Sequence, residues 1–228
     1  MQIHQTATTV SVETLIGTGL LFLATVKLAN VSKRSSEMDL RAYVSIREIA
    51  MTANMNPLSA NMIDSWRIRP VWENNGKTPT RNLTCWTNYK RFSQKNPKES
   101  EFKDVHLGQD PLVFPHLIIG PLGHIQGEDI HIPATEIQTA LSGNEHIFVW
   151  GWAEYDDMIT RGKPHHRTEF CVYITTLGDP TLNGSNLLFN FHTFHNGFDD
   201  EIDWKYSPVL MYRKLAPFRQ LLLRRKKI

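Results

Sequence analysis

Histidine and acidic side chains gather near the C-terminal third of the chain. His192 and His195 form an HxxH pair, and Asp199 and Asp200 follow it closely. Imidazole and carboxylate groups together can bind Zn²⁺ or Fe²⁺. Positions three apart converge best on a helix, whereas residues 187–194 have a strand-like pattern, on which the two histidines would face opposite sides. We therefore expect a solvated acidic loop, with a metal-dependent enzyme as the alternative.

A second polar group surrounds an expected β-hairpin. Asp156 and Asp157 precede the segment TRGKP, which contains Arg161, and His165 and His166 follow it. Adjacent carboxylates can supply a general acid and base, but aspartate at a strand end more commonly caps a turn. We interpret Asp156, Arg161, His165 and His166 as binding residues at an exposed loop, and we predict no catalytic residue.

A further turn, ENNGKTP, adds Asn75 and Lys77 to the binding candidates. Its Asn-Gly and Thr-Pro pairs are turn signals. Motifs of serine nucleophiles, zinc proteases and phosphate-binding loops are absent from the sequence. The sequence therefore favours a binding protein that needs no cofactor.

The chain between residues 41 and 214 has the pattern of a series of strands. Apolar and polar residues alternate in the segments Val44–Arg47, Trp66–Trp72, Leu83–Trp86, Ile147–Tyr155, Phe170–Thr175 and Leu187–Phe191. Seven or eight strands separated by turns predict a mainly β fold, an antiparallel immunoglobulin-like β-sandwich, with a closed barrel as the alternative. Residues 56–63 are expected to form a short helix or loop, and residues 92–105 a flexible surface loop.

Aromatic residues and cysteines lie on these expected strands. Phe148, Trp150 and Trp152 share one strand face, which we expect to pack between the sheets, although an uncovered face would be a partner surface. Cys85 and Cys171 are expected to stay reduced in the cytoplasm. Outside the cytoplasm they could instead form an inter-sheet disulfide.

An apolar segment precedes the strands. Residues 14–26 read TLIGTGLLFLATV, and Lys27 is the only charged residue up to position 31. This length is just sufficient to cross a bilayer, for which about 20 apolar residues are usual. We predict a membrane anchor at residues 1–31, a polar linker or helical continuation at 32–40, the β-sandwich at 41–214 and a basic tail at 215–228. A signal peptide and the helix of a soluble protein that oligomerises through it are the alternatives.

Charge indicates the orientation of this anchor. Lysine and arginine are absent before the apolar segment, whereas Lys27, Lys33, Arg34 and Arg41 lie at its end or follow it. The positive-inside rule then predicts an N-terminus outside the inner membrane and a cytoplasmic β domain, with a periplasmic domain as the alternative. The chain has 25 basic and 23 acidic residues. This balance argues against nucleic acid as a partner.

Several segments together resemble a family. Arg41-Ala42-Tyr43-Val44, Asn75–Pro79, Tyr155–Asp157 and His166–Cys171 occur in this order. They resemble the R-A-Y-V, N-x-G-K-T-P-A, Y-x-D and H-x-T-x-F-C segments of uncharacterised bacterial proteins with one transmembrane helix and a β-rich domain. Thr80 stands where those proteins usually have alanine. The resemblance implies the architecture and a bacterial origin, and it implies no activity.

The expected function follows from these observations. We predict a membrane-anchored β-sandwich that contacts the lipid bilayer through its N-terminal helix and binds an unidentified protein partner without catalysis. The sequence does not identify the partner.

Overall fold

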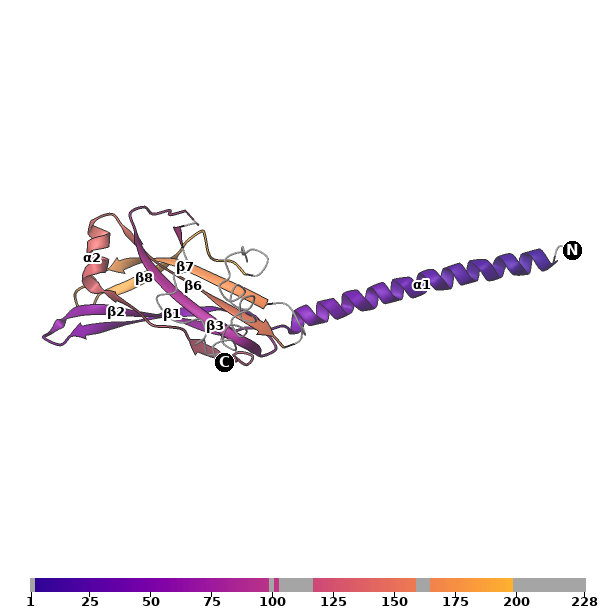
Figure 1. Ribbon diagram of the computed structural model, residues 1–228, viewed down its shortest axis with the longest axis horizontal. Coiled ribbons are helices and arrows are strands. Elements are labelled where there is room, and N and C mark those ends of the chain that lie inside the picture. Colours follow the sequence, from indigo (N-terminus) through magenta and orange to yellow (C-terminus); the bar gives the residue numbers. More distant parts are fainter. Residues whose placement is uncertain (1–2, 99–100, 103–116, 159–164, 199–228) are drawn as a thin grey trace, which may run out of the picture. The chain divides into compact units, whose positions relative to one another are not determined.

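The computed structural model describes residues 3–98, 101–102, 117–158 and 165–198. The chain divides into two compact units, residues 1–41 and residues 42–228. Figure 1 shows the elements in chain order: α1 (Ile3–Leu40), β1 (Val44–Asn56), β2 (Ser59–Asn74), β3 (Thr80–Phe92), β4 (His124–Gln126), β5 (Ile130–Pro133), α2 (Ala134–Ser142), β6 (His146–Asp157), β7 (His165–Leu177) and β8 (Asn186–Phe191). The prediction of a mainly β chain with an N-terminal helix is confirmed.

Helix α1 contains the apolar segment. It runs on through residues 32–40, so this polar segment is a helical continuation and not an extended linker. The 24 residues from Thr14 to Glu37 have the length and composition of a membrane-crossing helix, for which about 20 are needed. The hydroxyls of Thr18 and Thr25 each donate to a backbone carbonyl one turn earlier, at 2.8 Å. Both hydroxyls are therefore satisfied without water, as a lipid environment requires.

The strands form two antiparallel sheets. The first has the order β1–β2–β4, with β5 also paired to β2, and the second has the order β3–β6–β7–β8. The described strands do not close into one sheet, so the barrel alternative is wrong. Helix α2 follows β5 and buries Ala134, Ile137 and Ala140. The sequence analysis did not predict this short helix.

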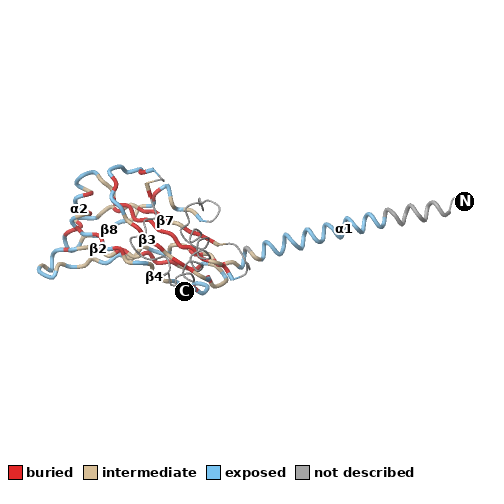
Figure 2. Tube along the Cα trace, in the orientation of Figure 1, coloured by how far each residue is buried: buried red, intermediate tan, exposed pale blue. Residues whose placement is uncertain are grey.

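An apolar core lies between the two sheets. It combines Ile68 and Trp72 of the first sheet with Val149 and Phe170 of the second. The rings of Trp72 and Phe170 meet edge-on, with their centroids 5.6 Å apart. This geometry is favourable for aromatic pairs and adds to the stabilisation from apolar burial. Figure 2 shows the buried segments concentrated in the strands, while the far end of the β1–β2 hairpin is exposed.

Phe148 and Trp150 do not lie between the sheets, where the sequence analysis placed them. They belong to a second apolar cluster, on the outer face of the second sheet. The ring of Phe102 covers them, with centroid distances of 5.5 Å to Phe148 and 5.3 Å to Trp150. Within the described part of residues 92–105, the predicted surface loop thus contributes a buried ring. The second sheet is covered on both faces.

Residues 56–63 form the end of β1, a two-residue turn and the start of β2, and not a short helix or an independent loop. Asn56 pairs with Ser59, which leaves Pro57 and Leu58 in the turn. The side chain of Asn56 accepts a hydrogen bond from the backbone N–H of Leu58 at 2.8 Å. An asparagine side chain that accepts a hydrogen bond from the backbone N–H two residues ahead is common in turns.

Candidate functional site

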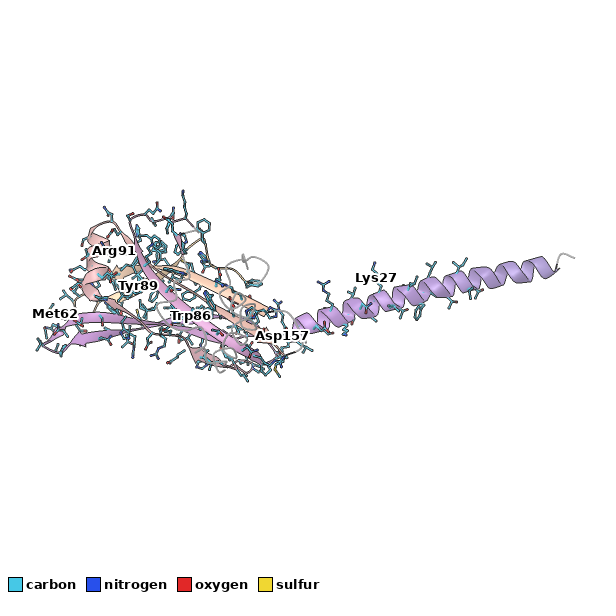
Figure 3. All side chains as sticks on the ribbon, in the orientation of Figure 1. Lys27, Met62, Trp86, Tyr89, Arg91 and Asp157 are labelled. Atoms are coloured by element: carbon cyan, nitrogen blue, oxygen red, sulfur yellow. The ribbon has the colours of Figure 1, made fainter. Side chains whose placement is uncertain are left out.

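Two of the predicted binding segments lie at the same end of the β domain. Thr80, the first residue of β3, pairs with Asp157, the last residue of β6. The β2–β3 turn therefore adjoins the β6–β7 hairpin, at the end that Asp157 marks in Figure 3. Asn75 and Lys77 are exposed in the turn. The predicted binding residue Arg161 lies outside the described residues.

The buried Asn74 organises this turn. Its side-chain oxygen accepts two backbone hydrogen bonds and its nitrogen donates two more, at 2.7–3.1 Å. The partners are Tyr43 N–H, Gly76 N–H, Thr78 C=O and Ile119 C=O. The sequence analysis singled out the neighbouring Asn75 and missed Asn74, because an Asn-Asn pair does not show which side chain is buried.

Asp156 and His165 face each other across β6 and β7. His165 Nδ1 lies 3.1 Å from Asp156 Oδ1, and His165 Nε2 lies 2.8 Å from Glu154 Oε2. Asn82 Nδ2 donates to the second oxygen of Asp156 at 2.8 Å. The structure thus brings two predicted binding residues together and adds Glu154, which is wholly buried.

Alternating charges continue along the same face of the sheet. Arg167 Nη1 donates to Glu154 Oε1 at 2.9 Å, and Arg167 Nε donates to Glu169 Oε1 at 2.6 Å. The second oxygen of Glu169 lies 3.0 Å from His195 Nδ1. The Arg167 guanidinium lies 4.8 Å from the centre of the Trp152 ring. We call the following six residues the charge ladder: Asp156, His165, Glu154, Arg167, Glu169 and His195.

The geometry favours a positive charge on His165. Both ring nitrogens face carboxylate oxygens, and both can donate only in the doubly protonated imidazolium. His165 and Arg167 together pair with both oxygens of the buried Glu154, as a buried carboxyl group requires. Each ladder residue faces an oppositely charged or hydrogen-bonding neighbour, so the ladder is suited to joining β6 to β7.

Glu169 shows the effect of this arrangement on acidity. Burial raises the pKa of its carboxyl group. The hydrogen bond from His195 and the charge of Arg167 oppose this effect, and the net result is a pKa below the ordinary value. Glu169 is therefore ionised at neutral pH and stabilises the positive groups on both sides.

His166 is buried among the neighbouring strand residues. Its Nε2 lies 3.3 Å from Asp157 Oδ2, and its ring centroid lies 5.3 Å from that of Tyr155. The sequence analysis treated His166 as an exposed binding residue. The structure places it in the interior, with 2% of its surface exposed.

The two histidines of the predicted metal cluster lie in the loop after β8. Both rings contact Phe102, with centroid distances of 5.6 Å for His192 and 5.2 Å for His195. Burial and the charge of His195 lower the pKa of His192. Asp199 and Asp200 lie outside the described residues. In the described ranges, no three His, Cys, Asp or Glu side chains are arranged to hold a metal ion.

Asn196 holds this loop against β7. Its Oδ1 accepts from the Cys171 N–H at 2.9 Å, and its Nδ2 donates to the Cys171 carbonyl at 3.2 Å. The Glu169 N–H donates to the Gly197 carbonyl at 2.9 Å. The side-chain amide of Asn196 therefore acts as a paired strand residue would. The prediction for this loop used its histidines and aspartates and did not use the Asn196-Gly197 pair, which is a recognisable turn signal.

Cys85 and Cys171 lie on opposite faces of the second sheet. Cys85 packs against the central core, whereas Cys171 belongs to the outer cluster. Both are free thiols. Burial raises the pKa of both thiols, and that of Cys171 rises to about 12 with a further contribution from Glu169. The alternative of an inter-sheet disulfide is wrong, because the sheet itself separates the two sulfur atoms.

Comparison with known proteins adds no assignment to this geometry. No family model matches the chain, and neither a curated protein nor a solved structure is significantly similar to it. The resemblance to bacterial membrane proteins remains a prediction from the quoted segments.

Proposed function

We propose that the protein is a single-pass inner-membrane protein whose β domain is an immunoglobulin-like sandwich that binds a protein partner without catalysis. The observation that carries this proposal is the exposed apolar surface of α1. More than half of the surface is exposed at Leu15, Leu20, Leu21, Phe22, Leu23 and Leu28. Transfer of one large apolar side chain out of water is favourable by about 1.5–3 kcal/mol, so a lipid environment is strongly favoured for α1.

The distribution of charge supports a cytoplasmic β domain. Lys27, Lys33, Arg34 and Arg41 all lie at or after the end of the apolar segment, and no basic residue precedes it. Positive residues are retained preferentially on the cytoplasmic side. The family resemblance supports the order of an N-terminal membrane helix followed by a β domain.

The β domain supports a binding role in two ways. Two antiparallel sheets share one apolar core, which is compatible with an immunoglobulin-like sandwich, a fold that carries function in its loops. The exposed Asn75 and Lys77 lie in the turn before β3, whose first residue pairs with Asp157 at the end of β6, so segments distant in sequence meet at one end of the domain. The charge ladder beneath them holds β6 to β7 and supplies a rigid base for these loops.

Membrane fractionation tests the anchor. We expect the full-length protein to stay in the membrane pellet after an alkaline carbonate wash. The double variant Leu21→Arg/Leu23→Arg should move to the supernatant, because each arginine near the centre of a span costs about 2.5–3.5 kcal/mol. Ser35→Arg, in the polar part of α1, is the matched control and should stay in the pellet. A wild-type protein released by carbonate would contradict the anchor and support a soluble protein.

Reporter fusions test the orientation. A C-terminal reporter that is active only in the cytoplasm should be active, and one that is active only in the periplasm should be silent. The opposite result would place the β domain outside and direct the search for a partner to the cell envelope.

A further inference from the structure

Strand β1 ends the first sheet without the usual protection of an edge strand. It pairs with β2, and no backbone group of residues 49–56 pairs elsewhere within the described chain. The run from Ile49 to Ile63 (IAMTANMNPLSANMI) has no charged residue, although 21% of the whole chain is charged. Natural edges are usually blocked by charge, proline or a bulge. Here Arg47, Glu48 and a bulge protect the beginning of the strand, and register irregularities lie at Asn54–Asn56, so the stretch from Ile49 to Ala53 is the open part.

The inward face of this strand is incompletely covered. Ile49 and Ala53 pack against the central core, and Met51 and Met55 follow the same alternation. The two methionines nevertheless keep 37% and 39% of their surface exposed. Figure 3 shows Met62 near the free end of the same hairpin, far from Asp157. The partly exposed Met51 and Met55 therefore form an apolar strip beside the open edge.

The second sheet has a similar edge on this side. Strand β1 contacts β7, whose outer neighbour is the edge strand β8. Strand β8 contains no Asp, Glu, Lys or Arg. Leu188 and Phe191 of β8 are 49% and 72% exposed. The outermost strands on this side, β1 after Glu48 and β8, therefore carry no charged residue.

We propose that this side is a self-association surface on which β1 pairs antiparallel with β1 of a second copy. A two-fold axis brings residues near the axis close to the same residues of the second copy. A charged edge would therefore suffer repulsion between like charges, whereas an uncharged edge does not. An axis through Thr52, in the middle of the uncharged strand, pairs Thr52 with itself. Met51 then pairs with Ala53 of the second copy, and Ile49 pairs with Met55.

This pairing would cover both the open backbone edge of β1 and the exposed methionine side chains beside it. The outward backbone groups of β1 gain hydrogen-bond partners, and the two methionine strips become neighbours on one continuous sheet. The strand from Ile49 to Asn56 itself has no lysine, arginine or tryptophan, the residues that commonly anchor a surface to lipid, so a second copy is the better match. The proposal does not depend on the function or on the side of the membrane that the domain occupies.

Disulfide trapping tests the pairing directly in the full-length protein in detergent. We expect Thr52→Cys to form a covalent dimer under mild oxidation, because facing residues of paired strands meet the distance requirement of a disulfide. The native thiols are poorly reactive, since burial raises their pKa. His131→Cys is the matched control, since it is exposed on β5 at the other side of the same sheet. It should remain a monomer on denaturing gels.

Charge complementation gives an independent readout. We expect Thr52→Lys and Thr52→Glu each to lower the mass measured by light scattering to that of a monomer, and an equal mixture to restore the dimer. Thr52 is exposed, so both variants should fold, which circular dichroism checks. A monomeric wild-type protein would overturn the proposal. Association that survives both variants but is lost in Leu21→Arg/Leu23→Arg would also overturn it and assign the contact to α1.

Discussion

At the scale of single residues, Asn74 shows how one buried amide can hold several chain segments together. Its side chain satisfies four backbone groups that belong to the segment before β1, to the β2–β3 turn and to the connection leading to β4. Buried backbone groups are costly without hydrogen-bond partners. Asn74 therefore fixes the end of the domain at which the exposed Asn75 and Lys77 lie.

We predict that Asn74→Ala lowers the free energy of unfolding by about 2–4 kcal/mol, because four buried groups lose a partner and water can replace only some of them. Asn75→Ala is the matched control. Its side chain is exposed and donates to the Ser45 hydroxyl, so the change should stay within about 0.5 kcal/mol. Urea unfolding of both variants measures the difference. Equal losses would contradict the role of Asn74.

The sequence identifies ionisable residues more readily than it identifies their partners. Asp156 and His165 flank one hairpin, so their proximity follows from a short-range signal and could be predicted. The contact between Glu169 and His195 depends on the path of the loop after β8, for which the sequence offers only an Asn-Gly turn. Because the hydrogen bonds of Asn196 fix that path, half of the charge ladder was not predictable from spacing.

At the scale of elements, period-two alternation predicts where the strands lie, but it does not predict which segments pack on their faces. Alternation shows that the two faces of β6 differ, but it does not show what covers each face. Phe102 lies in a charged, proline-containing segment, which favoured a surface loop although its ring is buried. Helix α2 has nine residues, too few for a strong helical period. Both errors have the same physical cause, because long-range packing overrides local composition.

The charge ladder makes a prediction for the contact between β6 and β7. Arg167→Met should lower the free energy of unfolding by about 3–5 kcal/mol, because it leaves Glu154 buried without the guanidinium. The double variant Glu154→Leu/Arg167→Met should lose less than the single variant, since no uncompensated charge remains at that position. A double-mutant cycle with Glu154→Leu measures the coupling. Additive losses would show that the two side chains stabilise the strands independently.

At the scale of the whole molecule, histidines and carboxylates are placed so that acid weakens the fold in two stages. The pKa of His192 is below its ordinary value of 6.5, because of burial and the charge of His195. The unfolded chain therefore binds this proton more readily than the folded protein, and stability declines as the pH falls below about 6.5. The pKa of Glu169 is below its ordinary value of 4.5, so its contribution is complete above that pH and is lost below it.

We predict that His192→Phe removes the first stage of this loss. Phenylalanine keeps an aromatic ring against Phe148 and Phe102 and has no group to protonate, so the urea midpoint should change little between pH 7 and pH 5. The wild-type midpoint should fall over this interval. His131→Phe, at an exposed position, should keep the wild-type profile. If His192→Phe loses as much stability as the wild type between these pH values, the acid sensitivity arises from titratable groups other than His192.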